Sequence, residues 1–258
     1  MRAIWTGAIG FGLVNIPVKM YSATQSSTLD LDMLDKKDHS NIRFQRVNEK
    51  TGKEVAWENI VRGYKYNGEY VVLSDDDFKK ASPEKSKIIE IEQFVDQAEI
   101  DTIFYETPYY LEPEKSGTKA YALLRDALEK SGKVGLGTYV MRTKATIGLI
   151  KPMDDILVLN KIRFAEEIRD HEDLKIPDTK SKPNELKMAL ALIDQLTGEF
   201  EIDKYKDTYS DQLMELIEAK AKGKKIKAPT MKVVHSKSHD LMDQLKASLS
   251  TTTKRKAS

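Results

Sequence analysis

The sequence predicts a mainly β protein of the α+β class, with a β-barrel core followed by a helical arm and a basic tail. Short segments rich in β-branched and aromatic residues recur as far as Phe164, and they give roughly seven or eight strands, enough to close a barrel. Beyond Arg169 the apolar residues recur at helical spacing instead. Beyond Gly223 the chain is rich in lysine and poor in apolar residues, a composition typical of disorder.

The composition favours a soluble protein with a substantial core. Of the 258 residues, 40% are hydrophobic and 32% are charged, and the mean hydropathy is -0.51. No apolar run approaches the length of about 20 residues that a membrane span needs, and residues 1–5 lead into no long apolar segment, so we expect no export signal. The absence of cysteine excludes disulfides, thiolate metal sites and thiol nucleophiles, and it fits a reducing compartment.

The net charge of +1 conceals a strong asymmetry along the chain. Residues 220–258 carry eleven Lys or Arg and two Asp, a net charge of +9, so residues 1–219 carry a net charge of -8. A basic tail on an acidic body is typical of nucleic-acid contact or of a partner-binding arm. Because the body repels phosphates on average, it can bind DNA only through a locally concentrated basic surface.

The first two strands are expected in residues 3–21, where Gly7, Gly10 and Gly12 argue against a helix and suit the bends of a curved sheet. After a polar stretch, residues 41–73 predict two hairpins in succession. The second turns at Asn67-Gly68, because both residues tolerate a positive φ. The first pairs residues 42–47 with residues 53–57 around a longer turn that ends in glycine.

The double hairpin concentrates positive charge. Between Asn41 and Tyr66 there are three acidic residues and six basic ones: Arg43, Arg46, Lys50, Lys53, Arg62 and Lys65. One interpretation is a twisted ribbon that is held around a polyanion. The alternative is a solvated ribbon whose charges serve only solubility, and the residues alone leave both open.

The middle of the chain completes the barrel. Ser74 or Asp75 caps a helix, and residues 88–95 alternate as a strand. The aromatic stretch 99–117 is assigned to core packing rather than to base stacking, because its neighbouring charges are mostly acidic. A helix over residues 118–130 places Ala120, Leu123, Leu124, Ala127 and Leu128 on one face. Three further strands are expected at residues 134–141, 146–150 and 156–164.

Two amphipathic helices are expected in the arm, one over residues 184–196 and one that begins at Asp207 or Thr208. Neither has an obvious partner in the barrel, and such helices often pack against a second subunit. One short apolar island lies in the tail. As a helix it would present a partner-docking face made of Leu241, Met242, Leu245 and Leu249.

Catalytic motifs are absent. There is no GxxxxGK[ST] loop, GxGxxG after a strand, GxSxG or HExxH, and the four histidines lie in expected loops or in the tail. The remaining enzymatic interpretation is a metal-dependent nuclease that uses Asp75 to Asp77 or Asp154-Asp155. Nothing in the sequence brings these groups together, so we predict no catalytic residue, no metal ligand and no cofactor.

Several segments resemble bacterial Ku, the DNA-end-binding protein of non-homologous end joining. The resemblance covers residues 1 to about 222, and the tail is only loosely similar. The segments that carry it are RAIWTGAIGFGLVNIPVKMYSA, RVNEKTGKEVAWENIVRGYKYNGEYVVLSDDDF, EIDTIFYETPYYLEP, YALLRDALEKSGKVG, ELKMALALIDQLTGEF and KYKDTY.

The resemblance implies a β-barrel core over residues 1–170, a bridge ribbon inserted at about residues 25–66, a C-terminal helical arm over residues 171–223 and a basic, largely disordered tail over residues 224–258. It further implies a ring-shaped homodimer around duplex DNA. The ribbon falls on the basic stretch already noted, so both lines of reasoning select the same residues.

The function implied is sequence-independent binding and protection of double-stranded DNA ends by a cytoplasmic, nucleoid-associated protein that recruits an ATP-dependent end-joining ligase of the ligase D type. The alternatives are a protein-binding scaffold that touches DNA only through its tail, and the nuclease. The expected phosphate contacts, in order of preference, are Arg43, Arg46, Lys50, Lys53, Arg62 and Lys65, then Lys36 and Lys37, then Arg142 and Lys144.

Overall fold

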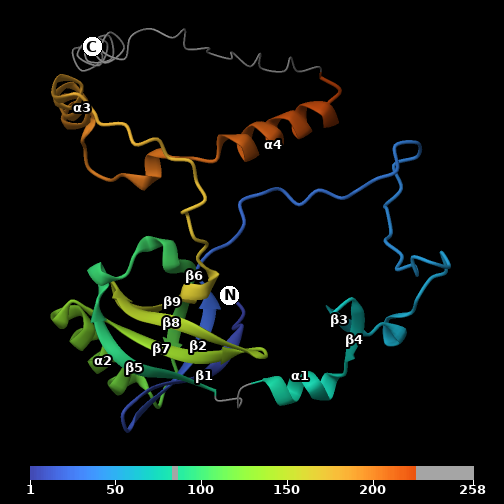
Figure 1. Ribbon diagram of the computed structural model, residues 1–258, viewed down its shortest axis with the longest axis horizontal. Coiled ribbons are helices and arrows are strands. Elements are labelled where there is room, and N and C mark those ends of the chain that lie inside the picture. The colour runs from blue at the N-terminus through green and yellow to red at the C-terminus, as the bar shows by residue number, and fades with distance from the viewer. Residues whose placement is uncertain (83–86, 225–258) are drawn as a thin grey trace. The chain divides into compact units, whose positions relative to one another are not determined.

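Seven strands form a closed barrel in the computed structural model, which describes residues 1–82 and 87–224 (Figure 1). Their order around the barrel is β1-β2-β6-β9-β8-β7-β5. This architecture confirms the fold class and the number of strands predicted from the sequence. The barrel strands are β1 (Trp5–Phe11), β2 (Val14–Ser22), β5 (Ile88–Asp96), β6 (Tyr105–Pro113), β7 (Lys133–Met141), β8 (Lys144–Met153) and β9 (Ile156–Ile162).

The barrel closes through one short parallel contact. Ala8–Gly10 of β1 pairs with Ile88–Glu90 of β5, whereas all other neighbours in the barrel are antiparallel. Just beyond, β5 has a bulge where it pairs with β7. A Cβ atom at Gly137 of β7 would collide with the backbone carbonyl oxygen of Glu90. The close approach of the two backbones therefore requires glycine at this position.

The hydrophobic core is built from alternate residues of the strands and from α2 (Thr118–Ser131). In β2, for example, Ile16, Val18 and Met20 are fully buried. Tyr121 of α2 connects the helix to two strands. Its hydroxyl group donates a hydrogen bond to the Leu111 carbonyl oxygen and accepts one from the Leu157 backbone N–H, both at 2.6 Å.

Two residues of the expected apolar face of α2, Leu123 and Ala127, are exposed. Leu124 and Leu128 are buried as expected, and the helix ends at Gly132 with φ 66°. Leu123, however, is 68% exposed, so the expected apolar face is only partly buried. The buried face is centred on Tyr121, Leu124 and Leu128, and this rotation turns Leu123 toward solvent.

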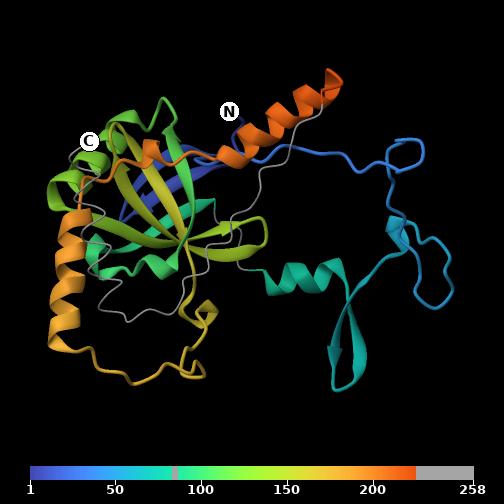
Figure 2. The ribbon, with the colours of Figure 1, turned by 90° about the horizontal axis from the view of Figure 1, so that it is seen from above.

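A two-stranded hairpin lies in the long segment between β2 and β5 (Figure 2). It consists of β3 (Arg62–Tyr66) and β4 (Glu69–Leu73), and it turns at Asn67 (φ 49°) and Gly68 (φ 91°) as predicted. The helix α1 (Asp75–Ala81) follows directly. Ser74 and Asp77 form a capping box at its N-terminus, which confirms the expected helix start.

The other predicted hairpin is not a pair of strands. Between residues 42 and 57 the structure has a single bridge, Val47 with Glu54, and Trp57 lies in a 3-10 turn (Trp57–Asn59). The prediction of two ladders in succession is therefore wrong for the first one. Almost every side chain in this stretch is exposed, so no buried face stabilises an extended ladder there.

The C-terminal arm forms a compact unit with residues 27–29, and the barrel unit comprises the other described residues as far as Asp170. The arm contains α3 (Pro183–Leu196) and α4 (Thr208–Ala221), close to where the sequence predicts two helices. Asp207 caps α4 and accepts hydrogen bonds from the backbone N–H groups of Tyr209 and Ser210. In the described part of the chain, no helix is long and apolar enough to cross a membrane.

Candidate nucleic-acid interface

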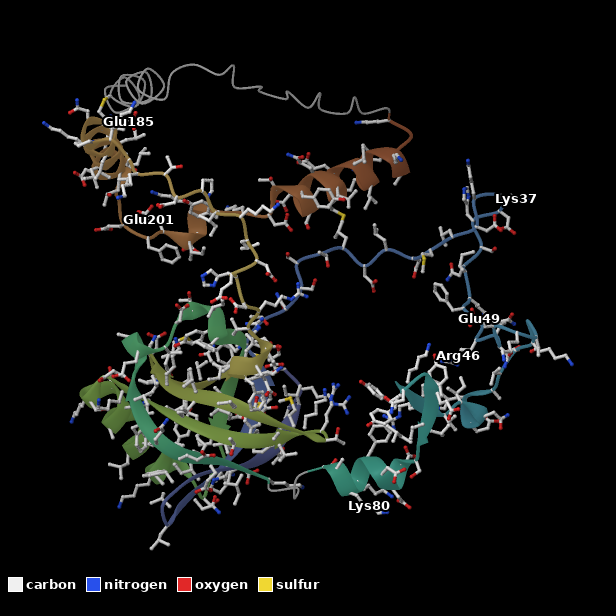
Figure 3. The ribbon with its side chains drawn as sticks, in the orientation of Figure 1. Lys37, Arg46, Glu49, Lys80, Glu185 and Glu201 are labelled. Carbon is white, nitrogen blue, oxygen red and sulfur yellow. The ribbon has the colours of Figure 1, made fainter. Side chains whose placement is uncertain are left out.

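All ten cations that the sequence selects are exposed. Eight of them lie in the segment between β2 and β4, and the other two, Arg142 and Lys144, lie where β7 turns into β8. Figure 3 shows Lys37, Arg46 and Glu49 on this extended segment. Because each side chain reaches solvent, each can meet an external phosphate without rearrangement of the core.

Lys36 and Lys37 lie on a small closed loop. The Asp35 N–H donates to the Ser40 carbonyl oxygen at 2.8 Å, and the Asp35 carboxylate accepts a hydrogen bond from the Lys37 backbone N–H at 2.7 Å. Hydrogen bonds from the backbone and the side chain of Ser40 hold the pKa of Asp38 below its ordinary value. The two carboxylates lower the net charge of the loop without forming a salt bridge to either lysine, so this loop is a weaker anion site than the sequence alone indicates.

Lys50 and Lys53 lie on a second loop that Asn48 closes. The Asn48 side-chain oxygen accepts hydrogen bonds from the backbone N–H groups of Lys50 (3.0 Å) and Thr51 (3.1 Å). The backbone N–H of Asn48 donates to the Lys53 carbonyl oxygen at 2.8 Å. Gly52 supplies the positive φ, 63°, that the turn requires. One locally ordered turn therefore carries two lysines, with Glu49 and Glu54 as their neighbours in the sequence.

Arg46 stands at the base of the second loop, over the ring of Trp57. Its guanidinium carbon is 4.6 Å from the ring centroid, which is cation–π geometry. The Val55 N–H donates to the Arg46 carbonyl oxygen at 2.8 Å, so the backbone at this position is fixed as well. The ring restricts the guanidinium group, and stacking on its face leaves the N–H donors in the guanidinium plane available to a phosphate.

Arg62 is engaged within the chain. It forms an ion pair with Asp75 at 3.1 Å, and its guanidinium carbon lies 3.8 Å from the centroid of the Phe78 ring. These contacts connect the β3–β4 hairpin to α1. Because its donors are partly used, Arg62 is the least available of the six preferred cations.

The remaining selected cations are not neutralised within the structure. Across residues 1–82 and 87–224, none of them takes part in a salt bridge: Lys36, Lys37, Arg43, Arg46, Lys50, Lys53, Lys65, Arg142 and Lys144. The positive charge of this surface is therefore available to an external partner.

Exposed aromatic residues accompany these cations, and the sequence analysis did not select them. Trp57 is 70% exposed and Phe44 79%, and on the hairpin Tyr64, Tyr66 and Tyr70 are each more than 60% exposed. The signal in the sequence is the interleaving of aromatic and basic residues between positions 43 and 70.

Three carboxylates of the nuclease interpretation, Asp75, Asp76 and Asp77, have local structural roles. Asp75 pairs with Arg62, Asp76 pairs with Lys79 at 2.8 Å, and Asp77 caps α1. Within the described residues, no three His, Asp or Glu side chains converge as a metal site would require.

Comparison with known proteins identifies the family. Residues 10–188 match the family model described as Ku70/Ku80 beta-barrel domain. The chain belongs to the Ku family. Proteins named "Non-homologous end joining protein Ku" are similar to almost all of it. One from Pseudomonas aeruginosa is 42% identical over 248 residues (94% of this chain, 85% of that protein), and one from Archaeoglobus fulgidus is 41% identical over 254 (96% and 98%). Another, from Bacillus subtilis, is 37% identical over 261 aligned positions (98% and 83%).

The Ku match confirms the resemblance found in the sequence. It includes the end of β1, every other barrel strand, the β3–β4 hairpin and all ten selected cations. The last helix, α4, lies beyond the family match, and the three relatives extend the similarity over 94% or more of the chain. Residues 241, 242, 245 and 249, the expected partner-docking face, lie outside the described residues.

Proposed function

We propose that this chain binds double-stranded DNA ends without regard to sequence, as a ring-shaped homodimer that acts in non-homologous end joining. The relatives are named for that process. The observation that supports the proposal is the run of exposed cations on the segment between β2 and β4, within the Ku match; in the described residues, all of these cations except Arg62 lie outside any salt bridge.

The geometry of these cations suits phosphates rather than bases. They lie on surface loops and on a hairpin, and none of them lies on an α-helix that could enter the major groove and contact bases. Contacts to phosphates alone carry no sequence information. Binding should therefore be governed by counterion release and be independent of sequence.

The end preference follows from a ring. A closed ring can be threaded only at an end, so no pocket for the terminus is needed. Support for a dimer comes from α3, whose apolar residues Leu186, Leu190, Ile193 and Leu196 are all at least 51% exposed. A helix stripe of this kind is ordinarily buried against another surface.

The further parts of the proposal concern partners and place. We assign no catalytic step to the chain, and we propose that it protects ends in the cytoplasm, at the nucleoid, and recruits an ATP-dependent ligase. The partner-docking face proposed for this recruitment is the apolar island of residues 240–249.

The decisive variant replaces four ribbon cations together. In Arg43→Ala/Arg46→Ala/Lys50→Ala/Lys53→Ala we expect much weaker binding to a linear duplex, with a melting temperature that falls by no more than a few degrees because all four side chains are exposed. A matched control, Lys87→Ala/Lys115→Ala/Lys119→Ala/Lys130→Ala, removes the same charge from exposed positions outside the ribbon. Equal affinity of the two variants would refute the ribbon assignment.

A further inference from the structure

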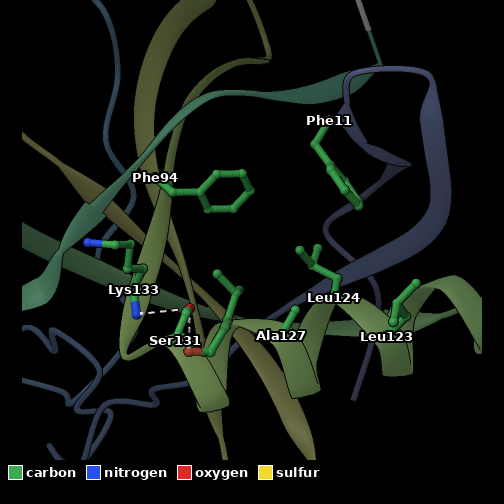
Figure 4. A pocket seen from close by; sticks show the side chains of 8 residues that line it. Phe11, Phe94, Leu123, Leu124, Ala127, Ser131 and Lys133 are labelled. Carbon is green, nitrogen blue, oxygen red and sulfur yellow. Dashed lines mark hydrogen bonds between the residues drawn. The ribbon is translucent and has the colours of Figure 1, made fainter.

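An apolar groove lies between α2 and the ends of β1 and β5 in the barrel unit (Figure 4). Its cavity volume is about 540 Å³. Phe11 and Phe94 from the strands face Leu123, Leu124 and Ala127 from the helix. The groove exists because the parallel pairing of the two strands stops at Gly10 and Glu90, after which the bulge carries β5 away along β7. It is a product of the way in which the barrel closes.

The lining is apolar and accessible. Leu123 is 68% exposed and Phe94 is 43% exposed, and the rings of Phe11 and Phe94 meet edge to face with centroids 6.4 Å apart. Each of these is a large side chain, and together they form one concave patch. Contiguous apolar surface of this kind marks interaction sites in folded proteins.

The few polar groups at the groove are already satisfied. The Ser131 hydroxyl group donates to the Leu128 carbonyl oxygen at 3.2 Å and accepts from the Lys133 backbone N–H at 3.3 Å. The Lys133 ammonium group pairs with Asp96 at 2.8 Å. Small-molecule sites orient their ligands with free polar groups that converge on the cavity. This groove lacks them, so apolar side chains of another protein fit it better than a metabolite does.

The border of the groove is cationic. Lys119 lies one helical turn before Leu123, and Lys130 lies one turn after Ala127, on the same side of α2. Both are exposed, and within residues 1–82 and 87–224 neither takes part in a salt bridge. Asp126, the neighbouring carboxylate on that side, is paired with Arg125 at 2.8 Å. An occupant with acidic residues beside its apolar anchors is therefore complementary in charge.

We propose that this groove docks a short amphipathic segment of a partner protein, with apolar side chains in the cavity and flanking carboxylates against Lys119 and Lys130. The surface is separate from the ribbon cations. A protein engaged in this way leaves the phosphate-binding surface free, so the barrel can hold DNA and a protein partner together.

The test uses two labelled synthetic peptides of about four helical turns, which share leucine and phenylalanine anchors and differ in their flanks, glutamate in one and lysine in the other. We expect the full-length protein to bind the glutamate peptide more tightly in fluorescence anisotropy. Leu123→Glu should weaken that binding by about tenfold or more, as loss of a central anchor does. Ile103→Glu, at a position that is 53% exposed outside the groove, should leave it unchanged.

Charge reversal gives a second arm that does not alter the groove lining. Lys119→Glu/Lys130→Glu should reverse the preference between the two peptides. This double variant and Leu123→Glu should both keep the DNA affinity of the wild type. Equal binding of the two peptides, or binding that survives Leu123→Glu, overturns the proposal. It is also overturned if Leu123→Glu changes the sedimenting mass of the protein without peptide, since a second copy of the chain would then be the occupant. The same holds if the peptide binds only after residues 225–258 are deleted, since that segment of the chain would then be the occupant.

Discussion

At the scale of single residues, the arrangement of Arg46 over Trp57 shows how a surface can order a charge without burying it. The guanidinium group keeps its donors in water, while the ring limits the orientations it explores. Less side-chain entropy is then lost when a phosphate binds. We therefore regard Trp57 as a positioning residue for Arg46.

This view predicts the behaviour of Trp57→Ala. We expect DNA affinity to fall by roughly two- to fivefold, as expected for an exposed cation–π contact of about 0.5–1 kcal/mol, with no change in thermal stability. Trp57→Phe should recover part of the affinity. Phe44→Ala is the control, because it removes a comparably exposed ring from the same segment. Equal losses in the two alanine variants would show that the Trp57 ring acts by direct contact with DNA rather than by positioning Arg46. The measurement is titration of a short duplex at constant salt.

Tyr121 has the opposite character, because its hydroxyl group is buried and joins α2 to two strands. In Tyr121→Phe the Leu111 carbonyl and the Leu157 N–H lose their partner, and we expect the free energy of unfolding to fall by about 1–3 kcal/mol. Urea denaturation measures this. Tyr70→Phe, at a position that is 72% exposed, should have no measurable effect.

At the scale of elements, the junction of β5 and β7 depends on a glycine. Gly137→Ala should destabilise the barrel by about 1–3 kcal/mol, because a methyl group must displace the backbone at Glu90. In the β3–β4 hairpin, Gly63→Ala meets only ordinary contacts near 3.5 Å and is the matched control. A Gly137→Ala protein as stable as the control in thermal unfolding would contradict the close approach.

The start of α4 depends on the charge of Asp207. Hydrogen bonds from the side chain and the backbone of Ser210 lower the pKa of this carboxyl group. The stabilisation is therefore complete above the ordinary aspartate pKa, and it is lost as the pH falls through the lowered value. In hydrogen exchange near neutral pH, Asp207→Ala should lose protection at the amides of Tyr209 and Ser210. Asp211→Ala, in the same turn but not the cap, should retain it.

At the scale of the whole molecule, a threaded ring and an open surface make different predictions for DNA topology. The protein should bind a linear duplex strongly and the same sequence closed as a small circle weakly. With about four phosphate contacts in each subunit, log K against log salt should have a slope of roughly -7 for the dimer. Equal binding to the linear and the circular form would exclude threading and favour side-on contact.

Deletion of residues 224–258 separates the tail from the ring. We expect the truncated protein to dimerise and to bind a long linear duplex, and to lose stimulation of its ligase. If all DNA binding is lost, the protein is instead a scaffold that touches DNA through its basic tail. Gel-shift and ligation assays on the same preparation distinguish these results.

Much of the fold could be predicted because its signals are local. Asn67-Gly68 specifies a hairpin turn, Ser74 and Asp77 specify a helix start, and Gly132 specifies a helix end, since each acts on backbone atoms within a few residues. The strand number was accessible from the order of such segments, and the family from longer stretches of sequence that resemble Ku. So was the position of the basic ribbon in the chain.

Other features were decided only by tertiary structure, because they depend on which residues become neighbours across the fold. Periodicity alone placed Leu123 on the apolar face of α2, but packing against the strands buried Tyr121 and left Leu123 exposed. Residues 42–57 have the pattern of a hairpin, yet they form only one bridge, because no other part of the chain that the structure describes packs against them to bury one face. Arg62 has the charge of a DNA contact but is held by Asp75 and Phe78. The sequence by itself determined the turns, the caps, the barrel and the family, and long-range packing determined which side chains remain free to act.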